Sequence, residues 1–175
     1  MSDIAGSSGS SGTSDSGKAA VDAVGTSDSV KGLNPWARHR ARRLVLQAIY
    51  QWQLSGLHIA DLEAQFSTNS GMKRADSEYF RELVRGIVSR TIELDTAFAP
   101  LLDRAVDALD QVERAALRLG TYELLFGLDV PVRVVIDEAV TLASTFGAEG
   151  SHSYINGVLD KLARQVRAEE MSIVR

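Results

Sequence analysis

The chain has 175 residues, of which 45% are hydrophobic and 24% charged, a composition typical of one globular domain. It contains no cysteine, which excludes disulfides, thiolate metal sites and cysteine nucleophiles, and is compatible with a cytoplasmic protein. No apolar run is long enough for a transmembrane helix, and no secretory signal is recognisable. The three histidines lie far apart in the sequence, none is in an H-E-x-x-H pattern, and no Gly-rich phosphate loop is present. No metal, cofactor or catalytic site is expected.

The net charge of −4 is distributed unevenly along the chain. Residues 1–34 carry −2, residues 35–60 carry +4 without any acidic residue, and residues 61–175 carry −6. The overall charge argues against a general nucleic-acid binder, but one basic segment stands out in an otherwise acidic protein.

Residues 1–34 are expected to form a disordered tail. Ser and Gly occupy 15 of these 34 positions, and no aromatic residue is present. Such a segment buries too little apolar surface to offset the entropy of ordering its backbone. The remaining residues, 35–175, are predicted to form one all-helical domain.

The first predicted helix spans 36–55. Asn34 is a good N-cap, Pro35 suits the first helical position, and Gly56 ends the helix. Apolar residues recur every three or four positions through this helix and those that follow. Six further helices are predicted, over 59–67, from a cap at Asp76 or Ser77 to about 98, from Pro100 to about 109, and over 111–126, 132–146 and 152–167. Residues 68–75 are predicted to form a loop. Seven helices and no convincing strand indicate an all-α bundle.

The basic segment begins with Arg38, His39, Arg40, Arg42 and Arg43. Four arginines within six positions repel one another, and guanidinium groups match phosphate geometry. RNA or DNA binding is one interpretation of this cluster. A solvated basic face, or arginines paired with the acidic remainder of the chain, is the alternative.

Other polar and aromatic residues have two interpretations each. Tyr50 and Tyr154 could stack on bases, or could pack half-buried with their hydroxyls satisfied. Ser151 next to His152 suggests a nucleophile and a base, but adjacent helical residues do not face each other, so Ser151 is expected to be an N-cap. Gly157 inside a predicted helix suggests the close approach of another helix.

Several separated motifs together resemble the NusB family of bacterial transcription antitermination factors, from Arg38 to about Leu162. They are RHRARRLVLQAIYQWQLS from Arg38, QVERAALRLGTYEL from Gln111, VPVRVVIDEAVTLASTFGAE from Val130 and SHSYINGVLDK from Ser151. The resemblance implies an all-α fold of about seven helices in two small packed subdomains. It also implies a non-enzymatic factor that binds the BoxA element of ribosomal RNA together with NusE, a small-subunit ribosomal protein. That complex promotes processive transcription by RNA polymerase.

The resemblance further implies which residues make these contacts. RNA contacts are expected at Arg38, His39, Arg40, Arg42, Gln47, Tyr50, Glu113, Arg118 and Tyr154. NusE contacts are expected at Tyr50, Asp107 and Glu113. Two positions depart from the family pattern: the position of Ser153 is basic in some relatives, and that of Gly150 is acidic.

Two other functions compete with this one. Some RNA methyltransferases carry a NusB-like helical domain, but this chain has no βαβ pattern and no cofactor loop. A protein-only interaction module would instead pair the arginines within the chain or with an acidic partner. A homodimer that hides the RNA surface is also compatible with the sequence.

Overall fold

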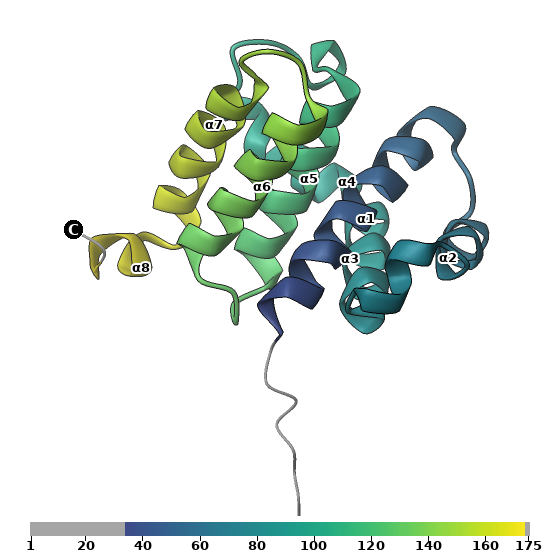
Figure 1. The fold of residues 1–175 in the computed structure, drawn as a ribbon. Helices are drawn as coiled ribbons and strands as arrows, with labels where there is room; N and C mark the ends of the chain where they lie inside the picture. Colours follow the sequence, from purple (N-terminus) through teal and green to yellow (C-terminus); the bar gives the residue numbers. More distant parts are fainter. Residues whose placement is uncertain (1–33, 174–175) are drawn as a thin grey trace, which may run out of the picture. The chain divides into compact units, whose positions relative to one another are not determined.

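The computed structural model describes residues 34–173, so the predicted tail over 1–34 lies outside them apart from Asn34. All regular secondary structure within 34–173 is helical, as predicted (Figure 1). None of these helices is long and apolar enough to span a membrane. The α-helices are α1 (Pro35–Ser55), α2 (Ile59–Ser67), α3 (Ser77–Ser89), α4 (Thr91–Phe98), α5 (Gln111–Phe126), α6 (Val132–Phe146), α7 (Ser151–Val166) and α8 (Ala168–Ile173). Three short 3-10 helices are η1 (Ser70–Arg74), η2 (Ala99–Leu101) and η3 (Val106–Ala108).

Helix α1 begins and ends as predicted. The side chain of Asn34 accepts hydrogen bonds from the backbone nitrogens of Trp36 and Ala37, at 3.1 and 3.2 Å. At the other end Gly56 adopts the left-handed conformation with φ 65°, which glycine tolerates at little cost. The predicted apolar stripe of α1 is buried, and it packs against α3 on one side and α5 on the other.

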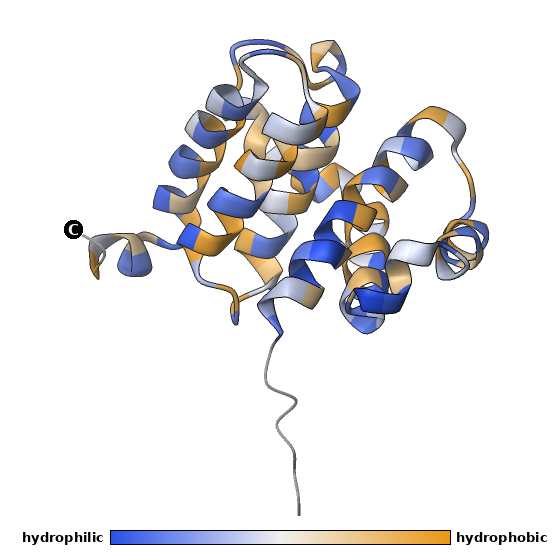
Figure 2. Ribbon diagram, viewed as in Figure 1, coloured by the Kyte–Doolittle hydropathy of each residue, from blue (hydrophilic) through white to orange (hydrophobic). Residues whose placement is uncertain are grey.

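The helices form two groups that share one core. Helices α1 to α4 form the first group, and α5, α6 and α7 pack side by side in the second (Figure 1). Helix α5 joins the groups because it contacts α1, α3 and α4 as well as α6 and α7. Orange apolar residues line the inward sides of these helices in Figure 2.

The predicted continuous helix to about residue 98 is wrong, because the chain breaks at Arg90. The backbone of Arg90 leaves the helical region, with φ −113° and ψ 17°. The hydroxyl of Thr91 donates to the carbonyl oxygens of Ile87 and Val88, so two carbonyls at the end of α3 keep a partner. The break redirects α4 so that Leu94 and Phe98 are fully buried, with α4 against α5 and α7.

Three shorter segments also differ from prediction. The helix predicted from Pro100 to about 109 is not an α-helix, and η2 and η3 occupy this segment instead. The predicted loop at 68–75 contains η1, and α8 was not predicted.

Ser151 is not an N-cap, since Gly150 with φ 84° holds that position and Ser151 begins α7. The hydroxyl of Ser151 donates instead to the carboxylate of Glu113, at 2.8 Å.

Two glycines in the helices should respond in opposite ways to alanine. A Cβ on Gly86 of α3 would lie 2.2 Å from the buried ring of Tyr122 on α5, whereas a Cβ on Gly157 would meet nothing within 4 Å. The predicted close approach of a helix at Gly157 is therefore wrong. We expect Gly86→Ala to destabilise the protein by about 1–3 kcal/mol, because overpacking outweighs helix propensity. Gly157→Ala should stabilise it by up to about 1 kcal/mol. Urea unfolding of both variants checks this pair, and stabilisation by Gly86→Ala would contradict the packing at α3 and α5.

Candidate nucleic-acid interface

One face of α1 is exposed along the whole helix. Its residues follow one another every three or four positions, which places them on one side of a helix with about 3.6 residues per turn. Arg40, Arg43 and Tyr50 are exposed, and Gln47 is half-buried between them. The full face consists of Trp36, Arg40, Arg43, Gln47, Tyr50 and Leu54, and we call it the α1 face.

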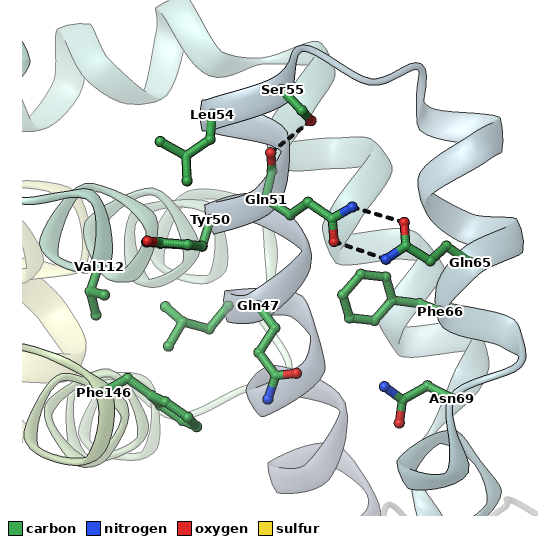
Figure 3. A pocket seen from close by; sticks show the side chains of 11 residues that line it. Gln47, Tyr50, Gln51, Leu54, Ser55, Gln65, Phe66, Asn69, Val112 and Phe146 are labelled. Atoms are coloured by element: carbon green, nitrogen blue, oxygen red, sulfur yellow. Dashed lines mark hydrogen bonds between the residues drawn. The ribbon is translucent and has the colours of Figure 1, made fainter.

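The α1 face borders two adjoining pockets. The larger, of about 690 Å³, is lined by residues of α1, by Gln65 and Phe66 of α2, and by Val112 and Phe146 from the second group of helices (Figure 3). The smaller, of about 250 Å³, is lined by Arg40, Arg43, Leu44, Gln47, Asn69, Ser70 and Gly71. Gln47 and Asn69 line both pockets, so the two form one continuous groove. No acidic residue lines either pocket.

The larger pocket combines aromatic and amide groups. Gln51 and Gln65 exchange two hydrogen bonds of 2.8 and 3.0 Å, which tie α1 to α2 along one wall (Figure 3). On the other side of α1 the guanidinium of Arg43 lies 5.0 Å from the ring centroid of Phe146. Tyr50 is the exposed aromatic residue of this groove, whereas Phe66 is buried and Phe146 half-buried. An exposed aromatic ring with amides and cations nearby can bind unstacked bases and phosphates.

Arg42 is placed differently from its predicted role as an RNA contact. Its side chain is 3% exposed and makes three hydrogen bonds of 2.7 to 3.0 Å to the carboxylate of Glu123 on α5. It also donates to the hydroxyl of Tyr79 on α3, which in turn donates to Glu123. Burial lowers the pKa of Arg42, but the carboxylate of Glu123 more than offsets this and the net pKa is raised. The guanidinium also lies 3.8 Å from the carboxylate of Glu138 on α6. Arg42 is thus an internal cation that joins four helices and is not presented to a ligand.

Arg38 and His39 also have acidic partners within the chain. The guanidinium of Arg38 lies 2.8 Å from the carboxylate of Asp129 and 4.2 Å from the ring centroid of Tyr79. Nδ1 of His39 lies 2.7 Å from the carboxylate of Glu138 on α6. Intramolecular pairing, the alternative interpretation of the basic cluster, is therefore confirmed for Arg38 and Arg42. Arg40 and Arg43 have no ion-pair partner among residues 34–173.

A buried arginine that the sequence analysis missed positions Asp129. The guanidinium of Arg167 donates to the carbonyl oxygens of Glu123, Leu124, Gly127 and Val130, at 2.7 to 2.9 Å. These carbonyls belong to the end of α5 and to the turn that follows it, so Arg167 fixes the turn that carries Asp129. Its only side-chain partner within residues 34–173 is Glu170, at 3.3 Å, and its other four partners are backbone carbonyls, so no sequence motif marks this arginine.

Two other predicted RNA contacts are buried and bound within the protein. Arg118 on α5 pairs with the carboxylate of Asp95 at 2.7 and 2.8 Å and donates to Gln53 at 3.1 Å. Glu113 is 9% exposed and accepts the hydrogen bond from Ser151. In this structure both residues hold helices together and are not presented to RNA.

The predicted contacts near the start of α7 are only partly exposed. Tyr154 is half-buried, its hydroxyl donates to Asp103 at 2.9 Å, and the guanidinium of Arg104 lies 4.9 Å from its ring centroid. Burial, followed by the carboxylate of Asp103, raises the pKa of Tyr154. The half-buried alternative is thus confirmed for Tyr154, whereas Tyr50 is exposed.

Asp107 of η3, a predicted NusE contact, lies at the surface with its side chain 98% exposed.

Comparison with known proteins places this helical region in a family. The NusB family model matches residues 39–164. The transcription antitermination protein NusB of Alcanivorax borkumensis is 54% identical over 138 residues, covering 79% of this chain and 92% of that protein. A NusB structure from T. maritima superimposes with a TM-score of 0.66 and 32% identity, covering 77% of this chain and 96% of that one.

A second solved structure contains the antitermination factors NusB and NusE in complex with double-stranded RNA. It superimposes with a TM-score of 0.62 and 29% identity, covering 73% of this chain and 96% of that one. The family match over the helical region and the identity to the Alcanivorax protein together show that the chain belongs to the NusB family.

Proposed function

We propose that this protein is a transcription antitermination factor that binds single-stranded RNA along the α1 face. The observation that carries the proposal is that Arg40 and Arg43, which have no ion-pair partner within residues 34–173, lie beside a continuous groove without acidic residues. The relatives named antitermination protein NusB, and the complex of NusB and NusE with double-stranded RNA, support the antitermination and RNA-binding parts of this proposal. The match to nearly the full length of these relatives favours an adaptor over an RNA-modifying enzyme.

The RNA is proposed to be the BoxA element of ribosomal RNA, bound together with NusE within the RNA polymerase antitermination complex. Phosphates would bind Arg40 and Arg43, and bases would contact Gln47 and stack on Tyr50. Arg38 and His39 lie beside this path, but their acidic partners must first be displaced. Tyr154 extends the path towards α7.

NusE is proposed to contact the surface that joins α1 to the start of α5. Tyr50 and the exposed Asp107 are its candidate contacts. Glu113 acts indirectly, because its hydrogen bond to Ser151 fixes the start of α7 beside that surface. Asp107 does not line either pocket, so a NusE contact there leaves Arg40 and Arg43 free for RNA, whereas Tyr50 is shared by the two proposed contacts.

Mobility shifts with BoxA RNA and a scrambled RNA, with and without NusE, test the proposed function. We expect tighter binding to BoxA than to the scrambled sequence, and a further gain with NusE. Arg38, Arg40 and Arg43 are each expected to neutralise one phosphate. A plot of log affinity against log salt concentration should then have a slope of about −2. Equal binding to both RNAs would remove the sequence-specific part of the proposal, and binding of NusE alone would favour the protein-only module.

Removal of the carboxylate at Asp129 should strengthen RNA binding. Its hydrogen bond with Arg38 lowers the pKa of Asp129, so the carboxylate is ionised at neutral pH and competes with phosphate for that guanidinium. Asp129 is 56% exposed, and an exposed ion pair contributes at most about 1 kcal/mol. We therefore expect Asp129→Asn to raise RNA affinity by up to about fivefold with little loss of stability. Fluorescence anisotropy measures the change.

The matched control is Asp137→Asn, which removes an exposed carboxylate of α6 that lies 3.7 Å from Arg133. It should leave RNA affinity nearly unchanged. A weaker affinity of the Asp129 variant would contradict the competition and would show instead that Asp129 orients Arg38 for RNA.

A further inference from the structure

A second group of unpaired cations lies beside the α1 face. Within residues 34–173, six lysines and arginines have no ion-pair partner: Arg40, Arg43, Lys73, Arg74, Arg81 and Lys161. Four of the six belong to α1 and η1, and all four are exposed. The motifs shared with the NusB family do not include η1.

Backbone contacts fix η1 against the part of α1 that carries the arginines. The backbone nitrogen of Asp76, just after η1, donates to the carbonyl oxygen of Ala37 at 3.0 Å. Near the other end of η1, a Cβ on Gly71 would lie 3.5 Å from the side chain of Leu44. Because Ala37 and Leu44 bracket Arg40 and Arg43 in the sequence, η1 lies along the same stretch of α1.

The smaller pocket lies between these two segments and continues the groove of the α1 face. Arg40 and Arg43 line one side of it, and Asn69, Ser70 and Gly71 line the other. Gln47 of α1 and Asn69 of the facing segment, both labelled in Figure 3, line the larger and the smaller pocket alike. The groove therefore leads from Tyr50, past the two arginines, to the turn that carries Lys73 and Arg74.

The chemistry of this end of the groove fits a nucleic-acid backbone better than a protein. Leu44 is the only large apolar side chain in the lining of the smaller pocket, and no acidic residue lines it. The nearest carboxylate in the sequence, Asp76, is engaged by the backbone nitrogen of Tyr79 at 3.0 Å. Protein interfaces are centred on apolar and aromatic side chains, whereas clustered cations with amides and hydroxyls bind phosphates and sugars.

We propose that η1 extends the RNA-binding surface, and that Lys73 and Arg74 bind backbone phosphates of nucleotides that flank the element held on the α1 face. This proposal rests on the proposed function, since it needs RNA on α1. Lys73 and Arg74 would contact RNA phosphates and not bases, so these contacts add affinity without adding sequence preference. Only an RNA long enough to extend beyond Arg40 at the end of the α1 face would reach Lys73 and Arg74.

The test compares a minimal BoxA RNA with RNAs extended by about six nucleotides of mixed sequence at the 5′ or the 3′ end. For the wild-type chain, we expect one of the two extensions to raise affinity by about 5- to 10-fold. The double variant Lys73→Ala/Arg74→Ala should bind the minimal RNA like the wild type and should lose this gain. Because two phosphate contacts are removed, the slope of log affinity against log salt concentration for the extended RNA should be shallower by about 1.4.

Two further variants sharpen the comparison. The charge reversal Lys73→Glu/Arg74→Glu should make the same extension unfavourable. Arg133→Ala/Lys161→Ala removes two exposed cations from α6 and α7 and should keep the full gain. Circular dichroism confirms that each variant is folded before its affinity is measured.

The outcomes separate the two proposals. If the wild-type chain binds the minimal RNA but neither extension adds affinity, or if the η1 variants keep the gain, the role of η1 is refuted and the proposed function stands. If the wild-type chain binds neither minimal nor extended RNA, both proposals fail. If the η1 variants lose NusE binding and retain the RNA gain, the surface is a protein contact and the proposal is overturned.

Discussion

Replacing Arg42 by alanine is expected to destabilise the protein by about 3–5 kcal/mol, because the variant leaves the carboxylate of Glu123 buried without its cation. Glu123 is 2% exposed, and Arg42 supplies three of the hydrogen bonds to it. Tyr79 would remain as the only side chain that donates to this carboxylate. The expected loss is a large fraction of the stability of a typical domain.

Urea unfolding measures this loss, and Arg43→Ala is the matched control. The two arginines are adjacent in α1, but Arg43 is exposed and has no ion-pair partner within residues 34–173. Its replacement removes only the contact with the ring of Phe146 and should cost at most about 1 kcal/mol. A second variant, Arg42→Met/Glu123→Leu, removes both charges and should recover much of the stability. A fully stable Arg42→Ala protein that has lost RNA binding would contradict the structural role and restore the predicted RNA contact.

The double variant Arg40→Ala/Arg43→Ala should lose about 100-fold in RNA affinity while remaining folded. Each charged hydrogen bond to a phosphate contributes about 1.5–3 kcal/mol, so a loss at the lower end of this range at each of the two sites gives a factor of about 100. Neither side chain has an ion-pair partner within the described residues, so their removal leaves no buried charge behind. The salt dependence of binding should become shallower as well.

Arg133→Ala/Lys161→Ala makes the same change in net charge on another part of the protein. We expect this variant to retain RNA affinity within about threefold, since long-range attraction is screened by salt. Equal losses in both double variants would show that RNA responds to overall charge. That result would contradict a defined site on the α1 face.

Much of the fold follows from local sequence signals. Asn34, Pro35 and Gly56 define both ends of α1 because capping depends on residues that are adjacent in the chain. The break at Arg90 was missed because apolar residues continue at helical spacing from α3 into α4. Its cause is tertiary, since α4 turns to bury Leu94 and Phe98 against helices much later in the sequence.

The site was harder to predict than the fold. Arg43 lies almost opposite the apolar stripe of α1, so its exposure could have been inferred from helical periodicity. Arg40 and Arg42 flank the stripe on either side at similar angles, and periodicity does not decide which flank is covered. The partner that covers Arg42 is Glu123, which is 81 residues away in the sequence. Only the packing of α5 against α1 distinguishes the buried arginine from the exposed one.

Photo-crosslinking is the most direct test of where RNA lies on the protein. BoxA RNA that carries 4-thiouridine at successive positions would be crosslinked in the presence of NusE, and the modified peptides identified by mass spectrometry. We predict crosslinks to α1 between Arg40 and Leu54, centred on Tyr50, that are lost when scrambled RNA is used. Crosslinks confined to α4 or α8, with none on α1, would contradict the assignment of the α1 face as the RNA-binding surface.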